Sequence, residues 1–567
     1  MKKKKMIDCL LIGHNQIDMT QYEKILRQMG TDSGFYRDLN LSFIWYNNKP
    51  YSASDIFNLF YCYGDSAREE NRPVSMGETF SNAIAYLGTY IHGRGFTFDY
   101  VNSFRDDKEK LKAILKENHV LTVAVITTLY VSMLPIIEIV NFVREHNPAA
   151  KIIVGGPFIF YQFKTLNPSS IKHLFEKEIG ADIYVNSSQG EATLVKILHA
   201  LKNKLSWHDI NNIYYKTDGR YISTPLLSEN NILSDNPVQW DLFAHRIGRV
   251  VNIRTSISCP FSCFFCGYPE YAGKFQSITA GEIIHQLKQL HKIESVDRVI
   301  FIDDTFNVPR QRYKQLLPLM VKNKFRFKWI SNFRAQYVDT EMVRLMKDSG
   351  CEVVFLGLES GSDKILENMN KMSSVGKYLD GIARLKEQGI LTMGSFILGF
   401  PGETQKTVRQ TIEFIKKSGI DFFRVHLWYC QPITPIWRQR NKFKLKGDAF
   451  DWEHETMDCR TASHMIYDIF STIDEPVWVP QYDFEFNSIW NLLERGMTLE
   501  EVKKFLGAFQ QGVKQKIMNP NKKDVTTDVI RQISETAAPC SLLPDNGDKQ
   551  PKTVIANDLE NTIRFNF

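Results

Sequence analysis

The sequence of 567 residues lacks the features that would assign it to a membrane or to a nucleic acid. Its first apolar stretch, residues 6–13, is interrupted by Asp8 and is too short for a signal peptide or a membrane span. It has no strong charge of one sign, because 70 basic residues are balanced by 64 acidic ones and the net charge is +6. No basic stripe interleaved with aromatic side chains is present. We therefore expect a cytoplasmic protein that binds neither membranes nor nucleic acids.

The chain also lacks a pattern of paired cysteines. It contains nine cysteines, an odd number, and six of them are scattered singly: Cys9, Cys62, Cys351, Cys430, Cys459 and Cys540. Such scattered cysteines are not a disulfide framework. We expect free thiols in a reducing compartment.

What the sequence does contain is an alternation of short apolar runs and amphipathic segments. Over residues 1–215, five runs rich in β-branched or aromatic residues predict buried strands, at 7–13, 96–102, 121–128, 151–156 and 181–186. Helical patterns between them predict an α/β fold with a doubly wound parallel sheet. Residues 216–245 lose this rhythm and carry Asp, Asn, Ser and Pro, which predicts a linker.

A second alternation begins near residue 250. Amphipathic helical patterns separate six further strand candidates, at 251–257, 298–303, 327–332, 352–358, 391–398 and 421–428. Six βα units within 246–440 predict a partial barrel, two units short of a complete one. Residues 441–567 are less regular and predict a smaller, mainly α-helical region with a loosely ordered tail after about residue 537.

Three cysteines stand together directly after the first barrel strand. Cys259, Cys263 and Cys266 form the spacing CxxxCxxC. A structural zinc site needs four ligands. His285 or His291 on the next predicted helix could be proposed as the fourth, but each is more typical of a residue on the surface of that helix. Three thiolates suit a cubane iron–sulfur cluster, in which one iron is left open. The spacing therefore favours a [4Fe–4S] cluster over zinc.

This motif and four strand-end strings resemble the cobalamin-binding radical S-adenosylmethionine (SAM) enzymes. The strings are FIDDTFN at 301–307, WISNFRA at 329–335, FLGLESGSD at 355–363 and GSFILGFPGET at 394–404. The resemblance implies that the open iron of the cluster binds SAM, which is then cleaved to a 5′-deoxyadenosyl radical. It also implies a reducing electron donor such as flavodoxin or ferredoxin.

The resemblance implies roles for residues at the carboxyl ends of the barrel strands, where such barrels hold their active sites. Phe265 matches the aromatic residue beside the adenine of SAM, Glu359 and Ser360 match residues that hold its ribose or methionine part, and Arg334 lies near its carboxylate. Three further SAM contacts are implied at Asp304, Asn332 and Ser395.

Some of these residues have structural alternatives. Asp304 and Asn307 are also typical caps of a following helix. Gly399, Pro401 and Gly402 are also typical turn residues.

Two loops of the amino-terminal domain resemble the cobalamin-binding domain that precedes the barrel in these enzymes. They are VGGPFI at 154–159 and NSSQGEATL at 186–194, and the resemblance implies cobalamin contacts at Gly155, Gly156, Pro157, Gly190 and Glu191. The usual DxHxxG motif is absent where IGHNQID stands at 12–18, so His14 is not placed as an axial ligand by motif. A nucleotide-binding or purely structural sheet is the alternative.

The resemblance implies four regions. They are a Rossmann-like cobalamin-binding domain at 1–215, a linker at 216–245, a radical SAM barrel at 246–440 and a carboxyl-terminal substrate or capping region at 441–567.

Cobalamin beside a radical generator implies methyl transfer, in which one SAM methylates cobalamin and another supplies the radical. Three segments most resemble the phosphinate P-methyltransferase group: residues 8–52, PITPIW at 432–437 and FDWEHETMD at 450–458. The implied substrate is a small natural-product-type molecule that accepts the methyl group on an unactivated carbon or a phosphinate phosphorus. Two alternatives stay open: a radical enzyme of this architecture that catalyses a cyclisation or rearrangement, and a non-catalytic iron–sulfur or metal-binding module.

Substrate contacts are expected over the barrel mouth. His426 and Tyr429 are the catalytic candidates, and the other candidates there are Gln431, His454 and, for an anionic group, Arg424. Tyr429 and the neighbouring Trp428 equally suit an aromatic floor of the barrel.

Overall fold

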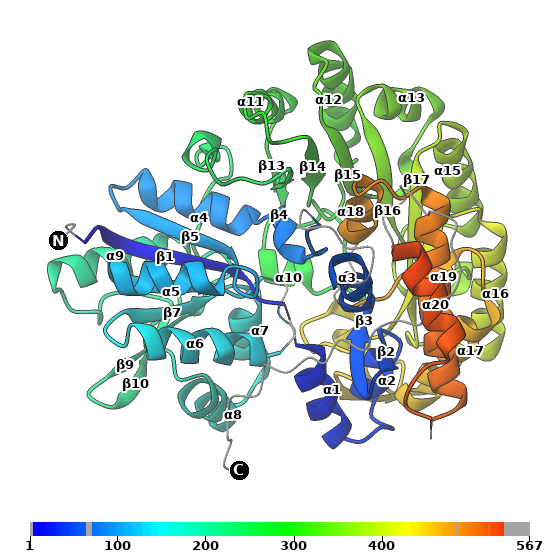
Figure 1. Ribbon diagram of the computed structural model, residues 1–567, viewed down its shortest axis with the longest axis horizontal. Coiled ribbons are helices and arrows are strands. Elements are labelled where there is room, and N and C mark those ends of the chain that lie inside the picture. The colour runs from blue at the N-terminus through cyan, green and yellow to red at the C-terminus, as the bar shows by residue number, and fades with distance from the viewer. Residues whose placement is uncertain are drawn as a thin grey trace.

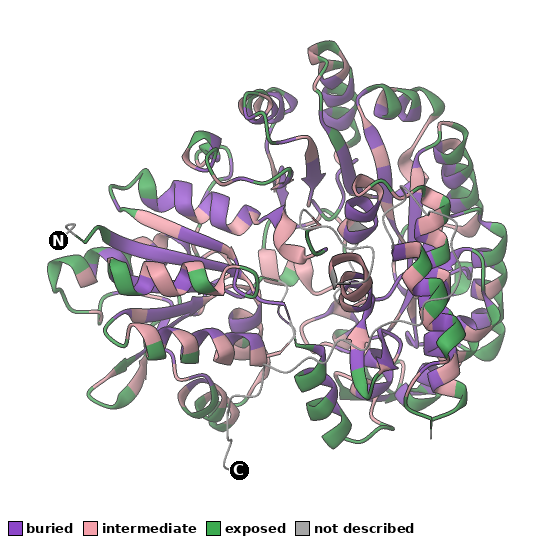
Figure 2. Cartoon of the chain, viewed as in Figure 1, coloured by how far each residue is buried: buried purple, intermediate pink, exposed green. Residues whose placement is uncertain are grey.

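Two parallel sheets, one in each half of the chain, organise the protein (Figure 1). The structure is a computed structural model, which describes residues 4–16, 18–63, 71–128, 130, 132–482, 486–520 and 522–537. The predicted tail after residue 537 and Cys540 lie outside the described residues. Buried side chains gather on both sheets and on the helix faces turned toward them (Figure 2).

The amino-terminal sheet is the predicted doubly wound sheet. Its strand order is β10-β9-β8-β7-β6-β1-β5. The parallel strands are β1 (Met6–His14), β5 (Phe98–Ser103), β6 (His119–Ile126), β7 (Lys151–Gly155) and β8 (Ile183–Val185), and the antiparallel β9 (Ile213–Thr217) and β10 (Arg220–Ser223) extend one edge.

Helices cover both faces of this sheet. The side chains of β1 point alternately to the two faces, so the strand contributes to a core on each side. Leu11 belongs to the core shared with α4 (Asn82–His92) and α9 (Glu191–Asn203). Ile12 belongs to the core shared with α5 (Lys108–Glu117) and α6 (Leu134–His146). Apart from Asp8 and the terminal His14, the strand is therefore apolar, as expected of a strand covered on both faces.

Between β1 and β5 the chain leaves this sheet and packs on the carboxyl-terminal helices. The excursion comprises α1 (Met19–Gln28), α2 (Gly34–Leu39), β2 (Phe43–Tyr46), β3 (Lys49–Ser52) and α3 (Ala53–Tyr63). It contacts α17 (Cys459–Thr472), α19 (Leu499–Met518) and α20 (Thr527–Ala537), so blue and red ribbons lie side by side in Figure 1.

A buried lysine secures this packing. Lys516 of α19 donates hydrogen bonds to the carbonyl oxygens of Asn40 (2.7 Å) and Phe43 (2.5 Å). Burial lowers the pKa of Lys516 well below its ordinary value. The chain's opening segment is therefore held by its closing helices.

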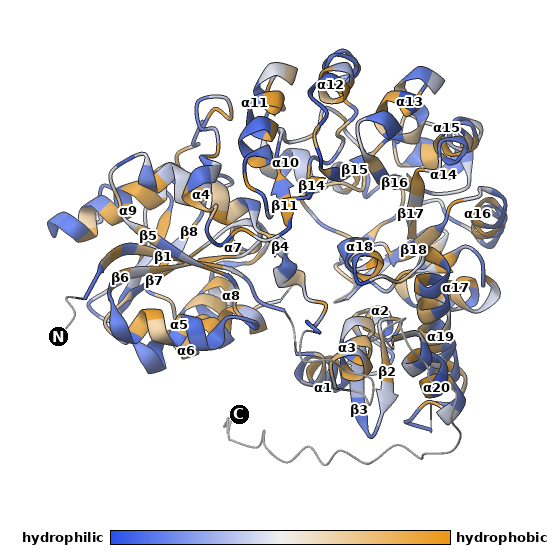
Figure 3. Ribbon diagram, turned by 45° about the horizontal axis from the view of Figure 1, so that its top comes forward, coloured by the Kyte–Doolittle hydropathy of each residue, from blue (hydrophilic) through white to orange (hydrophobic). Residues whose placement is uncertain are grey.

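The second sheet is the predicted partial barrel. Its six central strands, all parallel, are β11 (Val250–Ile253), β14 (Arg298–Phe301), β15 (Lys328–Phe333), β16 (Cys351–Glu359), β17 (Leu391–Leu398) and β18 (Phe422–Leu427). The outer helices visible in Figure 3 are α11 (Ala280–His291), α12 (Arg310–Asn323), α13 (Thr340–Asp348), α15 (Val375–Glu387) and α16 (Gln405–Lys417). Two short strands extend the sheet at its edges, β4 (Thr79–Phe80) beside β11 and β22 (Val477–Trp478) beside β18.

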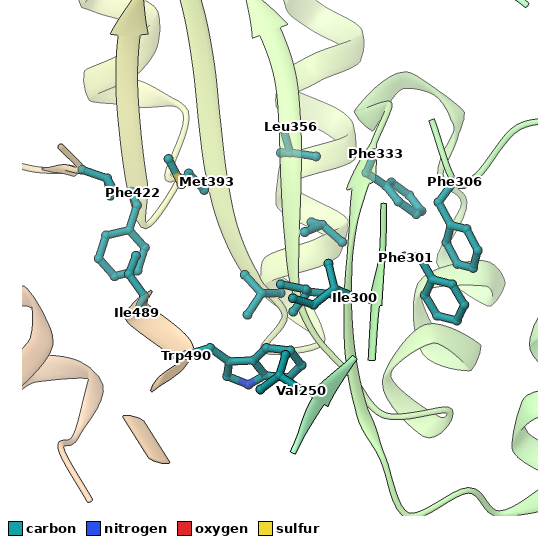
Figure 4. Close-up of a cluster of buried hydrophobic side chains, with 14 of the residues drawn as sticks. Val250, Ile300, Phe301, Phe306, Phe333, Leu356, Met393, Phe422, Ile489 and Trp490 are labelled. Carbon is teal, nitrogen blue, oxygen red and sulfur yellow. The ribbon is translucent and has the colours of Figure 1, made fainter. Parts of the chain in front are cut away.

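The amino end of the barrel is closed by α18 (Phe486–Glu494). The indole of Trp490 lies beside Val250, which begins β11 (Figure 4). Its Nε1 donates to Glu352 Oε2 (2.5 Å), and the Arg298 guanidinium lies 4.7 Å from its ring centroid. Helix α18 therefore plugs this end, which leaves the carboxyl end of the strands for a site.

Two further expectations concern cysteines and membranes. All eight cysteines within the described residues are free thiols. In the part of the chain that the structure describes, no helix combines the length and the apolar character that a membrane crossing requires.

The plug is tested by Trp490→Ala. Trp490 is 2% exposed, and truncating a buried tryptophan costs about 3–5 kcal/mol. We expect calorimetry to show a clearly lower melting temperature for the barrel transition. The control is Trp207→Ala, which removes a half-buried indole that packs on Tyr215 of the amino-terminal sheet, and we expect a much smaller shift. Equal melting temperatures for Trp490→Ala and the unmodified protein would contradict the plug.

Candidate functional site

The three predicted cluster cysteines lie in one loop between the short strand β12 (Ser256–Ile257), which follows β11, and the short helix α10 (Tyr268–Ala272). Cys263 is buried, and the other two thiols are half-buried. Backbone bonds fix the loop on two sides, since the Phe264 N–H donates to the Met369 carbonyl (2.9 Å) and the Phe264 carbonyl accepts from the Ile436 N–H (3.1 Å). The loop is therefore held by the barrel rather than projecting freely.

The thiols influence one another. Burial raises the pKa of Cys266 to about 12, with further contributions from Asp304, Cys263 and Cys259. Among the described residues, no three His, Cys, Asp or Glu side chains converge as the ligands of one metal ion do. A cubane cluster does not require such convergence, because each thiolate binds a different iron. Three thiols spread around one loop therefore fit a [4Fe–4S] cluster.

The two histidines considered as a fourth ligand have other surroundings. His285 is exposed on α11 and bonds to Gln289 through its Nε2 (3.2 Å). His291 packs against Phe325 and Phe327, with ring centroids 5.7 Å apart in each case.

Arg334 connects the loop to the barrel. It follows β15, is 5% exposed, and donates from Nη2 to the Cys263 sulfur (3.2 Å) and from Nη1 to the Lys371 carbonyl oxygen (3.1 Å). Its guanidinium also lies 3.5 Å from the centroid of the Phe261 ring. The predicted SAM-carboxylate contact is thus directly beside the central thiol.

A second buried charge, Lys371, was not predicted from the sequence. Its Nζ donates to Glu359 Oε1 (2.7 Å), and both side chains are buried. Burial alone would lower the pKa of Lys371, but the Glu359 carboxylate raises it above its ordinary value. Lys371 Nζ also lies 5.6 Å from the centroid of the Phe265 ring. Two predicted SAM contacts, Glu359 and Phe265, therefore meet at one lysine.

Glu359 occupies a strained position at the end of β16. Its φ is +67°, in the left-handed region that non-glycine residues rarely adopt. Strain of this kind persists only where the surroundings impose it, and it gathers at functional sites.

Acidic and amide side chains end strands β14 and β15. Asp303 is buried and accepts hydrogen bonds from the backbone N–H groups of Thr255 (2.7 Å) and Ser256 (2.9 Å). Asn332 Nδ2 donates to the Asp303 carbonyl oxygen (3.1 Å). Asp304 is accessible to solvent, yet desolvation by the surrounding protein, followed by the Asp303 charge, raises its pKa to about 7.

The helix-cap interpretation of Asp304 and Asn307 is wrong. The N-cap residue of α12 is Pro309, and no side-chain hydrogen bond caps the helix there. Asn307 instead donates from Nδ2 to the Arg334 carbonyl oxygen (3.0 Å) and accepts from the Arg334 N–H (3.2 Å). Asn307 therefore braces the residue that contacts Cys263.

Two other candidate SAM contacts are deeply buried. The Ser360 hydroxyl bonds with Thr411 Oγ1 of α16 (3.3 Å) and accepts from the Ser362 N–H (3.2 Å), which ties it to the outer helix layer. Ser395 lies in β17, in register with Gly357 of β16 and Arg424 of β18.

The catalytic candidates are contacted by different parts of the chain. His426 Nδ1 bonds with Gln481 Oε1 (3.0 Å), and burial, followed by the Arg424 charge, lowers the pKa of His426 to about 3. Burial, followed by the Asp448 charge, raises the pKa of Tyr429, and the nearby Tyr161 of α7 (Pro157–Thr165) partly offsets this. The first candidate is thus held by the carboxyl-terminal region, and the second lies near a helix of the amino-terminal sheet.

The remaining substrate candidates differ in their surroundings. Trp428 is 2% exposed and packs on Phe400 and Trp452, which supports the aromatic-floor interpretation. His454 is buried and bonds through Nε2 with the Gly399 carbonyl oxygen (3.0 Å). The Gln431 side chain lies against Gly267. A Cβ added at Gly267 would lie 3.0 Å from Gln431 Oε1.

The predicted cobalamin loops follow β7 and β8. Gly156 has a φ of +114°, and a Cβ there would lie 2.9 Å from Thr127 Oγ1, so the position requires glycine. Pro157 begins α7, and Gly190 (φ +81°) is the N-cap of α9. Glu191 is buried and accepts from Asn231 Nδ2 of the linker (2.9 Å), and burial raises its pKa.

The carboxyl edge of the first sheet carries buried polar atoms without partners in the part of the chain that the structure describes. They are His14 Nδ1 at the end of β1, Ser132 Oγ after β6 and Asn186 Oδ1 after β8. Buried polar groups are normally hydrogen-bonded, and an open parallel sheet binds its ligands at this edge. The edge therefore fits a large polar ligand such as cobalamin.

The two predicted cofactor sites adjoin. Tyr271 of α10, five residues after Cys266, donates a long hydrogen bond to the Ser188 carbonyl oxygen (3.5 Å). Its ring also packs edge-on against Phe160 of α7, with centroids 5.1 Å apart. In Figure 1, α7 and α10 lie between the two sheets. Helix α10, which follows the cysteine loop, thus contacts the loop after β8 and helix α7 after β7.

Comparisons with known proteins agree with this arrangement. The family model of the Radical SAM superfamily matches residues 253–415. An uncharacterized methyltransferase of Pyrococcus horikoshii is 26% identical over 306 residues, 53% of this chain and 65% of that protein. An anaerobic magnesium-protoporphyrin IX monomethyl ester cyclase of Synechocystis is 22% identical over 340 residues, 57% of this chain and 65% of that protein. The chain thus spans less than two thirds of the length of both relatives.

A solved structure has the same fold. TsrM from Kitasatospora setae, a radical SAM methyltransferase with cobalamin and a [4Fe–4S] cluster bound, has a TM-score of 0.56 at 16% identity over 82% of this chain and 97% of TsrM. At that identity the likeness shows the fold, which confirms a Rossmann-like sheet followed by a partial barrel. With the family match and the cysteine loop at the barrel mouth, residues 253–415 of this chain are a radical SAM domain.

Proposed function

We propose that this protein is a cobalamin-dependent radical SAM methyltransferase that acts on a small molecule. The observation that carries the proposal is the contact of Tyr271 with Ser188 and Phe160, because it sets the cysteine loop against the predicted cobalamin loops. Radical formation and methyl transfer to one substrate require both cofactors at one place. The names of the Pyrococcus relative and of TsrM support methyl transfer.

Cys259, Cys263 and Cys266 would hold the cluster, and the carboxyl edge of the first sheet would hold cobalamin. When bound, reduced by an external one-electron donor such as flavodoxin and supplied with SAM, these groups provide a 5′-deoxyadenosyl radical and a transferable methyl group. Such chemistry needs reduced thiols, which fits a reducing cytoplasm.

The chain's own residues would orient SAM. Arg334 supplies a fixed positive charge beside Cys263, suited to the SAM carboxylate. Lys371 donates to one oxygen of the Glu359 carboxylate, and a carboxylate also accepts hydrogen bonds from ribose hydroxyl groups or an amino group. Phe265, beside Lys371, offers a flat apolar surface for adenine.

The methyl acceptor that we propose is a small natural-product-type molecule. The atom that receives the methyl group is a carbon or a phosphinate phosphorus. Tyr429 and His426 are the proposed catalytic residues. At neutral pH both would be uncharged, since burial raises the pKa of Tyr429 and lowers that of His426 to about 3. They would therefore act as hydrogen-bonding groups rather than as charges.

A second candidate is a cyclisation or rearrangement with cobalamin bound. The Synechocystis relative, named a cyclase, favours it. It needs the same cluster and SAM site, so product analysis distinguishes it from methyl transfer.

Product analysis tests the proposed reaction. We expect the anaerobically reconstituted protein, given SAM, a reductant and a methyl acceptor, to form both 5′-deoxyadenosine and S-adenosylhomocysteine, measured by mass spectrometry. Formation of 5′-deoxyadenosine alone with every methyl acceptor tried would favour the second candidate. Neither product in a protein that holds its iron would contradict both.

Cys263→Ala tests the cluster. We expect about four irons and four sulfides per reconstituted chain, and the loss of most of this iron in the variant, because a [4Fe–4S] cluster with one open iron needs all three thiolates. Cys351→Ala removes a buried thiol of β16, away from the loop, and should keep the iron. Retention of all iron in Cys263→Ala would contradict the assignment.

Lys371→Met tests the buried charges. Removing one partner of a buried ion pair costs about 3–5 kcal/mol. We therefore expect the reconstituted variant to bind SAM at least about tenfold more weakly, as measured by calorimetry. Lys364→Met removes an exposed lysine that pairs with Glu367 and should bind SAM normally. Unchanged affinity in Lys371→Met would show that the Glu359–Lys371 pair does not support the SAM site.

A further inference from the structure

Asp38 is a buried carboxylate on the excursion between β1 and β5. It lies in α2, which contacts both α1 and α17. The residue is 7% exposed, and among the described residues its side chain accepts one hydrogen bond, from the Tyr482 hydroxyl to Oδ2 (3.1 Å). Buried carboxylates are normally paired with a cation. Asp38 therefore has unused bonding capacity in a place that is shielded from water.

No residue that the structure describes forms an ion pair with Asp38. The guanidinium of the neighbouring Arg37 donates instead to Asp32 Oδ1 (2.9 Å) and lies 2.9 Å from His464 Nε2. The other titratable side chains around Asp38 are uncharged at neutral pH, because burial raises the pKa of each: Tyr22, Cys459, Tyr467 and Tyr482. Burial also raises the pKa of Asp38 to about 7. The charge that would stabilise this carboxylate is left for a ligand to supply.

Asp38 is connected to the barrel mouth by the segment after β22. Gln481 bonds through Oε1 with His426 Nδ1 (3.0 Å), and its backbone N–H donates to Ser42 Oγ of the excursion (3.4 Å). The next residue is Tyr482, the hydrogen-bond partner of Asp38. Two consecutive residues therefore bond to a proposed catalytic residue and to the buried carboxylate.

Aromatic contacts connect α2 to the other proposed catalytic residue. Phe35 of α2 packs edge-on against Phe450, and Phe450 packs edge-on against Tyr429, with ring centroids 5.0 Å apart in both pairs. The apolar cluster that contains Tyr22 also packs against Leu134, which begins α6 after the carboxyl end of β6. Helix α2 therefore borders both the barrel mouth and the carboxyl edge of the first sheet.

Two tyrosine rings stand beside the carboxylate. The ring centroids of Tyr22 and Tyr482 are 5.8 Å apart, and the ring planes are inclined by 56°. A carboxylate accepts hydrogen bonds from an ammonium group and balances its charge, and aromatic faces attract the same cation. An anionic ligand would instead be repelled by Asp38. The chemistry of the site thus selects a positively charged amine.

We propose that Asp38, with Tyr22 and Tyr482, binds an ammonium group of the methyl acceptor. The inference rests on the proposed function, which requires a small-molecule acceptor between the two sheets, and it adds the substrate class, namely amines. The competing account is that Asp38 is a neutral carboxyl group that only bonds to Tyr482.

Matched ligands test the requirement for a positive charge. The probes are butylammonium and phenethylammonium, each compared with an uncharged alcohol of the same shape, pentanol and phenylpropanol. Their binding to the full chain, reconstituted with its cluster and cobalamin, is measured by calorimetry at about pH 8. We expect at least one amine to bind at least about tenfold more tightly than its alcohol.

Asp38→Asn keeps the shape of the side chain and removes its charge. We expect this variant to bind each amine no more tightly than the matching alcohol, with its circular dichroism spectrum and its SAM affinity unchanged. Asp380→Asn removes an exposed carboxylate of α15 that pairs with Arg384 and should keep the amine preference. A loss of SAM affinity in Asp38→Asn would assign the carboxylate to the amino group of SAM and overturn the inference.

The unmodified chain provides a second readout, which a poorly folding variant cannot obscure. The Asp38 carboxylate forms as the pH rises through its pKa of about 7, whereas an alkylammonium group keeps its proton up to about pH 10. We therefore expect the amine preference to grow between about pH 6 and about pH 8.

The outcomes separate the inference from the proposed function. An amine preference that is absent, that survives in Asp38→Asn, or that stays constant over this pH range would overturn the amine site. If such a protein still forms 5′-deoxyadenosine and S-adenosylhomocysteine, the methyltransferase proposal stands. An amine preference that depends on Asp38, in a protein that forms neither SAM product, would contradict the methyltransferase proposal alone.

Discussion

A buried ion pair, Glu359–Lys371, is the constraint on which the proposed site depends. Both charges are buried with 2.7 Å between them, so neither is tolerable without the other. Lys371 also presents its carbonyl oxygen to Arg334, and Arg334 reaches the Cys263 sulfur. The cysteine loop, the end of β15 and the end of β16 are therefore fixed relative to one another before any cofactor binds.

Contacts connect this site to both the amino-terminal sheet and the carboxyl-terminal region. Toward the amino terminus, α10 leaves the cysteine loop and its Tyr271 contacts the loops after β7 and β8, where the first sheet ends. Toward the carboxyl terminus, Gln481 holds His426 at the barrel mouth, while α18 fills the opposite end of the barrel. Segments far apart in the sequence thus leave one place, between the two sheets, for the chemistry.

The sequence predicts the parts of this arrangement that depend on local patterns. Apolar runs located the five parallel strands of the first sheet and the six barrel strands, because a strand buried on both faces must be apolar along its length. Cysteine spacing located the loop, because Cys259, Cys263 and Cys266 stand within eight positions and one loop can present all three to a cluster. The strings at the strand ends led to Arg334, which contacts the Cys263 thiol, and to Glu359, which pairs with Lys371.

Other features depend on tertiary contacts that no local pattern encodes. Lys371 stands in an irregular segment, and only the fold pairs it with Glu359. Asn307 has the composition of a helix cap, but its amide braces Arg334. The excursion at 19–63 is amphipathic, which predicts a buried face and not that the carboxyl-terminal helices cover it. Strands β4 and β22 have two residues each, too few for any periodicity.

The proposed function requires the cluster and cobalamin to lie next to each other between the two sheets. Electron paramagnetic resonance of cob(II)alamin in the fully loaded protein tests this directly, with the cluster first oxidised and then reduced. Neighbouring paramagnetic centres interact, so we expect that reducing the cluster broadens or splits the cob(II)alamin lines and shortens their relaxation time. Two spectra that simply add, with relaxation unchanged, would contradict it.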